Sequence, residues 1–260
     1  GNASQQYSFA RKPKRALKEA RAIIAKCINA EPEEIFFTSG GTESDNWAIK
    51  GTAFADDKKH TIITSQIEHH AVLKACEDIE KFGYPVIYLP VTKKGIITPE
   101  ALNSVINPDT HLVSVMYANN EIGTIEPIEE LCEIAHRNGA LFHTDAVQAV
   151  GHIKIDVKAL GVDMLSASAH KFNGPKGIGF LYIKKGTPIS SYASGGAQEF
   201  GMRAGTENVA SIVGMAVALK KNCERIQEVS RHLLAYEDLL IEKLKTAGID
   251  FARNGSDNHI

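Results

Sequence analysis

Short apolar runs alternate with helical patterns along this chain, and the alternation constrains its fold more than any single residue does. The strand-like runs cover residues 35–38, 61–64, 86–89, 112–116, 141–144 and 164–167. Helical patterns cover 43–55, 71–82, 127–138 and 207 to about 245, the last with an expected interruption near 224–229. Strand and helix in repetition predict an α/β fold with a largely parallel central sheet flanked by helices.

Size and charge narrow the class of protein. The chain has 260 residues, of which 43% are hydrophobic, and this is enough to bury a large core. The length fits one large domain or one and a half domains. The 29 basic and 31 acidic residues give a formal net charge of −2, so no global field favours nucleic acid or an anionic membrane. No apolar run approaches the ~20 residues of a membrane span, and residues 1–6 lack the apolar centre of a signal peptide. A cytoplasmic protein is expected.

The four cysteines do not form a metal-binding pattern. Cys27, Cys76, Cys132 and Cys223 are widely separated and fall within helical stretches. Zinc sites place cysteines in close pairs, which this sequence lacks. We interpret these residues as reduced structural thiols and expect no metal.

A lysine follows the strand-like run at 164–167. Lys171 lies between His170 and the turn Asn173-Gly174-Pro175. Ligands of parallel sheets bind beyond the carboxyl ends of the strands, so a lysine there is placed to react. Desolvation or nearby positive charge would help it lose its proton and form a Schiff base with a carbonyl compound. The alternative is a solvated surface lysine, which is the commoner case.

Two glycines and a threonine follow the run at 35–38 and open a helix. Gly40 and Gly41 allow backbone N–H groups to approach an anion, Thr42 adds a hydroxyl, and the helix N-terminus adds partial positive charge. The segment lacks the Gly-Lys-Ser/Thr of a P-loop and the spaced glycines of a dinucleotide site, so a monophosphate is indicated. An ordinary capping box, with Thr42 or Ser39 as the N-cap, would explain it equally.

Further polar residues follow other predicted strands. The pair His69-His70 stands at a helix start, where one imidazole could stack on an aromatic ligand, or simply cap the helix. Asn119 and Asn120 could donate hydrogen bonds to a ligand or form a turn. Asp145 ends a buried strand and needs a cationic partner, such as a pyridinium nitrogen, unless it caps a helix.

A glycine-rich loop at 195–208 could reach a second anion. Each of these segments has an ordinary structural explanation. Together they supply a phosphate-binding turn at residues 39–42, which we call the cup, an imidazole that can stack on a ring, amide donors, an acid and a lysine. Pyridoxal 5'-phosphate (PLP) is one cofactor that uses all of them.

Five motifs in order resemble the NifS/IscS-type cysteine desulfurases, which are class V aminotransferase-like PLP enzymes of fold type I. They are Phe37-Thr38-Ser39-Gly40-Gly41-Thr42-Glu43-Ser44-Asp45-Asn46, Glu68-His69-His70-Ala71-Val72-Leu73, Asn119-Asn120-Glu121-Ile122-Gly123, Asp145-Ala146-Val147-Gln148 and Ser168-Ala169-His170-Lys171. The resemblance covers essentially the whole chain and implies the large domain of fold type I.

This resemblance implies a role for each motif. Lys171 would hold PLP covalently and move the substrate proton, His69 would stack on the ring as a second catalytic residue, and Asp145 would pair with the ring nitrogen. The implied remaining contacts are Gln148 with the phenolic oxygen, Asn120 beside the cofactor and substrate carboxylate, and Gly41, Thr42, Ser168 and His170 with the phosphate. Thr206 would reach the phosphate of a neighbouring protomer, which implies a homodimer.

The family reaction removes sulfur from L-cysteine, giving L-alanine and an enzyme persulfide that supplies a sulfur-acceptor protein such as an iron–sulfur scaffold. By the resemblance, residues 1–230 form the PLP-binding domain and 231–260 begin a C-terminal domain that is largely absent. The loop with the persulfide cysteine and the arginine for the substrate carboxylate are not expected in this chain. Phe200 also replaces the family's usual arginine. A selenocysteine lyase, another class V PLP lyase, or a non-catalytic PLP-binding scaffold for sulfur transfer remain alternatives.

Overall fold

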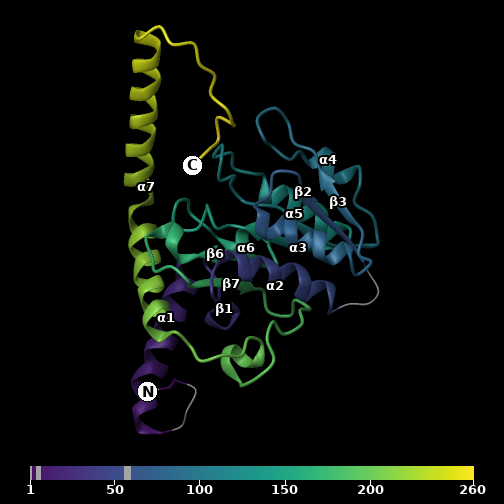
Figure 1. Ribbon diagram of the computed structural model, residues 1–260, viewed down its shortest axis with the longest axis vertical. Helices are drawn as coiled ribbons and strands as arrows, with labels where there is room; N and C mark the ends of the chain where they lie inside the picture. The colour runs from purple at the N-terminus through teal and green to yellow at the C-terminus, as the bar shows by residue number, and fades with distance from the viewer. Residues whose placement is uncertain (1, 4–6, 56–59) are drawn as a thin grey trace.

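The computed structural model describes residues 2–3, 7–55 and 60–260, and the centre of this described part is a seven-stranded sheet (Figure 1). Its spatial order is β1-β7-β6-β5-β4-β2-β3. The strands are β1 Ile35–Thr38, β2 Thr61–Ser65, β3 Val86–Leu89, β4 Thr110–Ser114, β5 Leu141–Asp145, β6 Met164–Ser168 and β7 Gly179–Ile183. The α-helices are α1 Arg11–Cys27, α2 Gly41–Ala53, α3 His70–Glu80, α4 Pro99–Asn103, α5 Ile128–Arg137, α6 Val157–Leu160 and α7 Val209–Thr246.

Strand direction confirms the predicted α/β class and adds one strand to it. The β3-β2-β4-β5-β6 part of the sheet is parallel throughout. Strand β7, which the sequence analysis did not predict, runs antiparallel between β6 and β1. The parallel strands therefore end at one common edge of the sheet, where the polar segments of the sequence gather.

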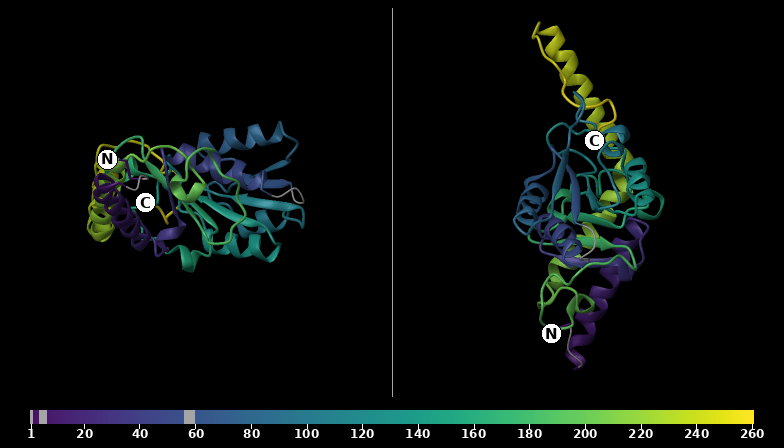
Figure 2. Two further views of the ribbon diagram at one scale, coloured as in Figure 1. Left: turned by 90° about the horizontal axis from the view of Figure 1, so that it is seen from below. Right: turned by 90° about the vertical axis from the view of Figure 1, so that its right-hand side faces the viewer.

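The sheet separates two hydrophobic cores because alternate side chains of a strand point to opposite faces. In β1, Phe36 packs into the core with Trp47 of α2 and with α3, whereas Ile35 and Phe37 join the opposite core with α1, α5 and α7. Ile62 and Ile63 of β2 divide in the same way. Figure 2 shows helices on both sides of the sheet. The sheet is therefore packed against helices on both of its faces, which fixes the positions of the strand ends.

Helix α7 is continuous over 38 residues, so the predicted interruption near 224–229 is wrong. Its buried residues all lie in its first half, and Asn222 there donates to the carbonyl of Phe172 (Nδ2 to O, 2.7 Å). The second half leaves the sheet (Figure 1, yellow) and exposes Leu233, Tyr236 and Leu240. Although α7 is long, no helix in the described part is apolar enough to cross a membrane.

Residues after α7 return toward the carboxyl edge of the sheet. His259 forms an antiparallel bridge with Thr124, and the N–H of Ile125 donates to the carbonyl of Asn258 (3.2 Å). An ion pair between Lys94 and Asp257 (2.8 Å) lies beside it. The end of the chain is therefore attached to the loop that carries Asn119 and Asn120.

All four cysteines are free thiols. Cys76 and Cys132 are buried, and Cys27 and Cys223 are half-buried where α1 meets α7. Burial raises the pKa of Cys76 and of Cys132 to about 12, so both stay protonated. Among the described residues, no group of three or more His, Cys, Asp or Glu side chains is arranged to hold a metal.

Candidate active site

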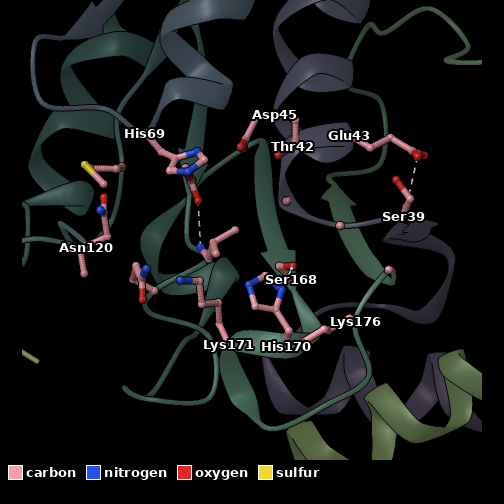
Figure 3. Close-up of a pocket in the computed structure, with 18 residues that line it drawn as sticks. Ser39, Thr42, Glu43, Asp45, His69, Asn120, Ser168, His170, Lys171 and Lys176 are labelled. Carbon is pink, nitrogen blue, oxygen red and sulfur yellow. Dashed lines mark hydrogen bonds between the residues drawn. The ribbon is translucent and has the colours of Figure 1, made fainter.

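A cavity of about 570 Å³ opens at the carboxyl edge of the parallel strands (Figure 3). That volume suits a small organic ligand. The residues that line it include nine of the ten predicted site residues: Gly41, Thr42, His69, Asn120, Asp145, Gln148, Ser168, His170 and Lys171. Sequence segments up to 130 residues apart are thus brought to one place, as the parallel topology requires.

Lys171 enters the cavity from a short 3-10 helix, Ala169–Phe172, that follows β6. Its carbonyl accepts a hydrogen bond from His152 Nε2 (2.9 Å), and Asn222 of α7 holds the next carbonyl, that of Phe172. The turn then closes with Asn173 in the left-handed conformation (φ 64°). The lysine side chain is exposed in the open cavity, and one short helix separates it from the buried strand that was predicted to deliver it.

The segment between β1 and α2 forms the predicted anion cup. Gly40, at φ 151° and ψ −176°, has a conformation that only glycine adopts readily. Gly40 is also the N-cap of α2, so neither Ser39 nor Thr42 caps this helix. A Cβ on Gly41 would lie 2.6 Å from Val147 Cγ2. The two glycines therefore let a helix start that has no side-chain cap face the cavity, where an anion fits.

Two more polar side chains complete the cup. Ser168, the last residue of β6, has its hydroxyl 2.9 Å from His170 Nδ1. The same hydroxyl lies 3.5 Å from the position that a Cβ on Gly40 would take, so the serine adjoins the glycine turn. Lys176 lines the cavity beyond His170 (Figure 3). Hydroxyl, imidazole, backbone and ammonium groups are the donors that a phosphate monoester requires.

Asp145 ends β5 as a buried acid, with 5% of its surface exposed. It accepts a hydrogen bond from the N–H of Val147 (2.9 Å). Burial raises the pKa of Asp145, while that N–H and the charges of His69 and Lys171 act to lower it. The carboxyl group lines the cavity, so a cation bound there would favour its ionised form.

Further buried ionisable groups lie at the cavity wall and behind it. Burial, followed by the charge of Asp145, raises the pKa of Asp45 well above its ordinary value, which favours the protonated form. Asp45 Oδ1 has no hydrogen-bond partner and lies 3.7 Å from His143 Nε2. His143 is in contact with two hydroxyls, Ser114 Oγ (2.8 Å) and Ser166 Oγ (2.9 Å), and burial lowers its pKa to about 3. The histidine is therefore neutral.

Glu68 belongs to the same buried layer. Its Oε1 accepts from the Ser65 hydroxyl (2.6 Å) and from the N–H of Met116 (2.9 Å), and Oε2 has no partner. Burial raises the pKa of Glu68 to about 8. The folded protein therefore binds a proton that the unfolded chain, with an ordinary glutamate, releases near pH 4.5.

Replacing Glu68 with glutamine should flatten the pH dependence of stability. For the native carboxyl, the free energy of unfolding falls as pH rises from about 4.5 to about 8, with a slope of at most about 1.4 kcal/mol per pH unit. Glutamine stays neutral and keeps the acceptor at Oε1. Urea unfolding of both proteins from pH 5 to 8 measures this, and parallel stability profiles would show that Glu68 does not titrate in that window.

Three predicted residues lie around the rim of the cavity. His69 is the N-cap of α3, where its Nδ1 accepts from the N–H of Ala71 (3.1 Å), and its ring also faces the cavity (Figure 3). Gln148 and Asn120 line this cavity and an adjoining one. Asn119 is buried instead and shapes the turn by accepting from the N–H groups of Glu121 and Ile122.

Thr206 is the predicted residue that lies elsewhere. It lines a smaller cavity of about 220 Å³ together with Ser39 and Arg203. Asp45 and Lys176 also line the cavity, although neither was predicted as a site residue. A signal for Asp45 exists in the sequence, because Gly41, Asp45 and Ala48 follow the spacing of one helix face, and that face is buried.

Residues 1–258 match the model of the aminotransferase class V family. The chain therefore belongs to the class V aminotransferase family.

Relatives within the family carry a narrower description. Cysteine desulfurase IscS of Methanosarcina thermophila is 55% identical over 245 residues, which are 94% of this chain and 61% of that protein. A solved NifS-like protein has a TM-score of 0.92 and 41% identity, with 95% of this chain and 69% of that chain covered. The structure described as SspA in complex with cysteine has a TM-score of 0.82 and 42% identity over 85% of this chain and 64% of that chain.

These comparisons confirm the resemblance to NifS/IscS-type cysteine desulfurases and the PLP fold type I architecture. The chain spans 61% of the length of the Methanosarcina relative.

Proposed function

We propose that this chain is the PLP-binding part of a cysteine desulfurase. The observation that carries the proposal is the single cavity in which Lys171, the buried Asp145 and the glycine cup of Gly40 and Gly41 meet. These three features match the aldehyde, the pyridine nitrogen and the phosphate of PLP. Relatives described as cysteine desulfurases, and a similar structure described as a complex with cysteine, support the choice of substrate.

The residues that line the cavity fit the chemical groups of PLP. The helix start at Gly41 and Thr42, with Ser168 and His170, would hold the phosphate. Asp145 would hold the pyridine nitrogen, and Lys171 would bind the aldehyde carbon covalently. The further contacts are His69 with the ring face, Gln148 with the phenolic oxygen and Asn120 beside the substrate carboxylate.

When bound, PLP supplies an electron sink for the negative charge that develops at the substrate Cα. Asp145 supports this by staying ionised opposite the protonated ring nitrogen. The free amine of Lys171 would hold the substrate Cα proton at Nζ and return it to the product. His69 would lie against the ring and keep it oriented for the proton transfer.

Sulfur leaves the substrate by transfer to a thiol. The C–S bond of L-cysteine breaks, a thiolate sulfur bonds to the released sulfur, and the carbon skeleton takes a proton to become L-alanine. None of the four cysteines lines the described cavity, and Cys76 and Cys132 are buried and protonated. None of these four cysteines is therefore assigned as the accepting thiol.

The assembly around this site is also proposed. Residues 1–230 form the PLP-binding domain, and residues 231–260, where α7 exposes Leu233, Tyr236 and Leu240, begin a second one. A homodimer is supported by the position of Thr206 outside the main cavity and by the exposed aromatic rings of Tyr192 and Phe200 in the same loop. The persulfide would pass to an acceptor such as an iron–sulfur scaffold protein, in the cytoplasm.

Product analysis tests the reaction class. We expect the PLP-loaded chain with L-cysteine and dithiothreitol, which replaces the protein thiol, to form alanine and sulfide in equal amounts. Release of pyruvate and ammonia would instead identify an elimination reaction and contradict the proposal.

A further inference from the structure

Glu43 places a negative charge beside the cup that we assign to phosphate. It lies in the first turn of α2, and its side chain lines the cavity together with Ser39, Gly40 and Thr42. An acid in the first turn normally stabilises a helix. Here the same helix start would receive an anion, so an uncompensated carboxylate would repel it.

Arg203 forms a two-point ion pair with this carboxylate. Its Nε lies 2.8 Å from Glu43 Oε1 and its Nη2 lies 3.1 Å from Oε2. The Glu43 side chain is only 9% exposed. Burial acts to raise the pKa of Glu43, but hydrogen bonds from Arg203 and Ser39 outweigh burial and lower it. Glu43 is therefore ionised, and its charge is matched by the guanidinium group.

The same carboxylate is joined to the cup itself. Glu43 Oε2 accepts a hydrogen bond from the N–H of Ser39 (3.2 Å), as Figure 3 shows. Ser39 precedes the two glycines that turn toward the cavity. The orientation of Glu43, which Arg203 fixes at two points, is thus transmitted to the backbone of the cup.

The loop that carries Arg203 is held firmly by a second buried ion pair. Glu199 accepts from Arg21 (2.7 and 2.8 Å) and from the N–H of Phe37 in β1 (2.8 Å). Glu199 and Phe200 both have left-handed backbones (φ 48° and 58°), which cost energy and need such support. The Phe200 ring packs on Phe36, with centroids 5.8 Å apart, and on the Arg21 guanidinium at 5.2 Å. Phe200 therefore replaces the usual arginine with an aromatic contact that secures this loop.

We infer that Arg203 is a positioning residue for phosphate: it neutralises Glu43 and orients it so that the cup accepts the anion of PLP. The inference rests on the proposed function, because it assigns the phosphate to this cup. Arg203 itself lines the smaller cavity with Thr206, so it acts on the main cavity through Glu43.

A double-mutant cycle read with two ligands tests the inference. PLP and pyridoxal share the aldehyde and ring, but only PLP carries the phosphate. We expect Arg203→Ala to weaken PLP binding by about tenfold or more, because Glu43 becomes an unpaired anion, and to change pyridoxal binding by less than about twofold. Glu43→Gln alone should bind PLP at least as tightly as the unmodified chain. Adding Glu43→Gln to Arg203→Ala should restore most of the PLP affinity.

Arg225→Ala is the matched control, because Arg225 pairs with Glu228 on the exposed part of α7 and should change neither affinity. Equal losses of PLP and pyridoxal affinity in Arg203→Ala would show a merely structural role and overturn the inference. Unchanged affinity, or no recovery in the double variant, would also overturn it. If the unmodified chain binds no PLP through Lys171, the proposed function itself fails, so the two failures are distinguishable.

Discussion

Replacing Lys171 with alanine should abolish covalent retention of PLP and lower alanine formation by at least roughly 10²- to 10⁴-fold, the range that a positioned acid–base group contributes. Two functions are lost together, because the proposal gives this one amine both the bond to the cofactor and the transfer of the Cα proton. Borohydride reduction followed by peptide mapping locates the covalent bond, and alanine analysis measures the rate.

Lys185 supplies the control for this prediction. It is exposed just after β7, away from the cavity, and Lys185→Ala should keep both the label and the rate. Among the residues that the structure describes, Lys176 is the other lysine that lines the cavity. A label that moves to Lys176, or that persists in Lys171→Ala, would show that the reactive lysine is wrongly assigned.

Asp145→Asn should reduce alanine formation by about 10²-fold or more while the fold is kept. The amide oxygen can still accept the hydrogen bond from the N–H of Val147, so the turn after β5 remains. What disappears is the negative charge opposite the ring nitrogen, an electrostatic contribution of the size that single preorganised groups make in active sites. The rate of alanine formation and the pH dependence of the absorbance of bound PLP both report it.

Asp45→Asn is the matched control, because Asp45 is a buried carboxyl in the same cavity. Its raised pKa favours a neutral side chain, and asparagine is also neutral, so the rate should change by less than about threefold. Should Asp45→Asn be as damaging as Asp145→Asn, the charge opposite the ring nitrogen could not be assigned to Asp145 alone.

The sequence predicts the parallel part of the fold well because its signals are local. Strands β1 and β3 begin and end at the predicted residues, and the other four predicted strands differ by one or two residues at their ends. Strand β7 was missed because Gly179–Ile183 follows a glycine-rich turn directly, with no helix before it to mark the usual alternation. Its position between β6 and β1 depends on non-local pairing, which a local pattern does not contain.

Helix α7 was predicted with an interruption that the structure does not contain. Its segment near 224–229, where an interruption was expected, is polar at four of its six positions. An exposed helix needs no apolar stripe, and Arg225 and Glu228, three residues apart, form an ion pair at 3.0 Å along its surface. The helix therefore continues where the sequence predicted an interruption.

The candidate site was predictable to the extent that its residues follow strand ends. Lys171 and Asp145 were found in this way, and the topology brings them into one cavity. The ion pair between Glu43 and Arg203 could not be predicted, because 160 residues separate its members and neither belongs to a spacing pattern. The shifted pKa values of Asp45, Glu68 and His143 were likewise not predictable, since they arise from tertiary burial.

The absorbance spectrum of the purified chain, titrated with PLP and then with L-cysteine, tests the central claim most directly. We expect a visible band that saturates at one PLP per chain and then changes on addition of L-cysteine. A chain that leaves the spectrum of free PLP unaltered would contradict the assignment of this cavity as a PLP site.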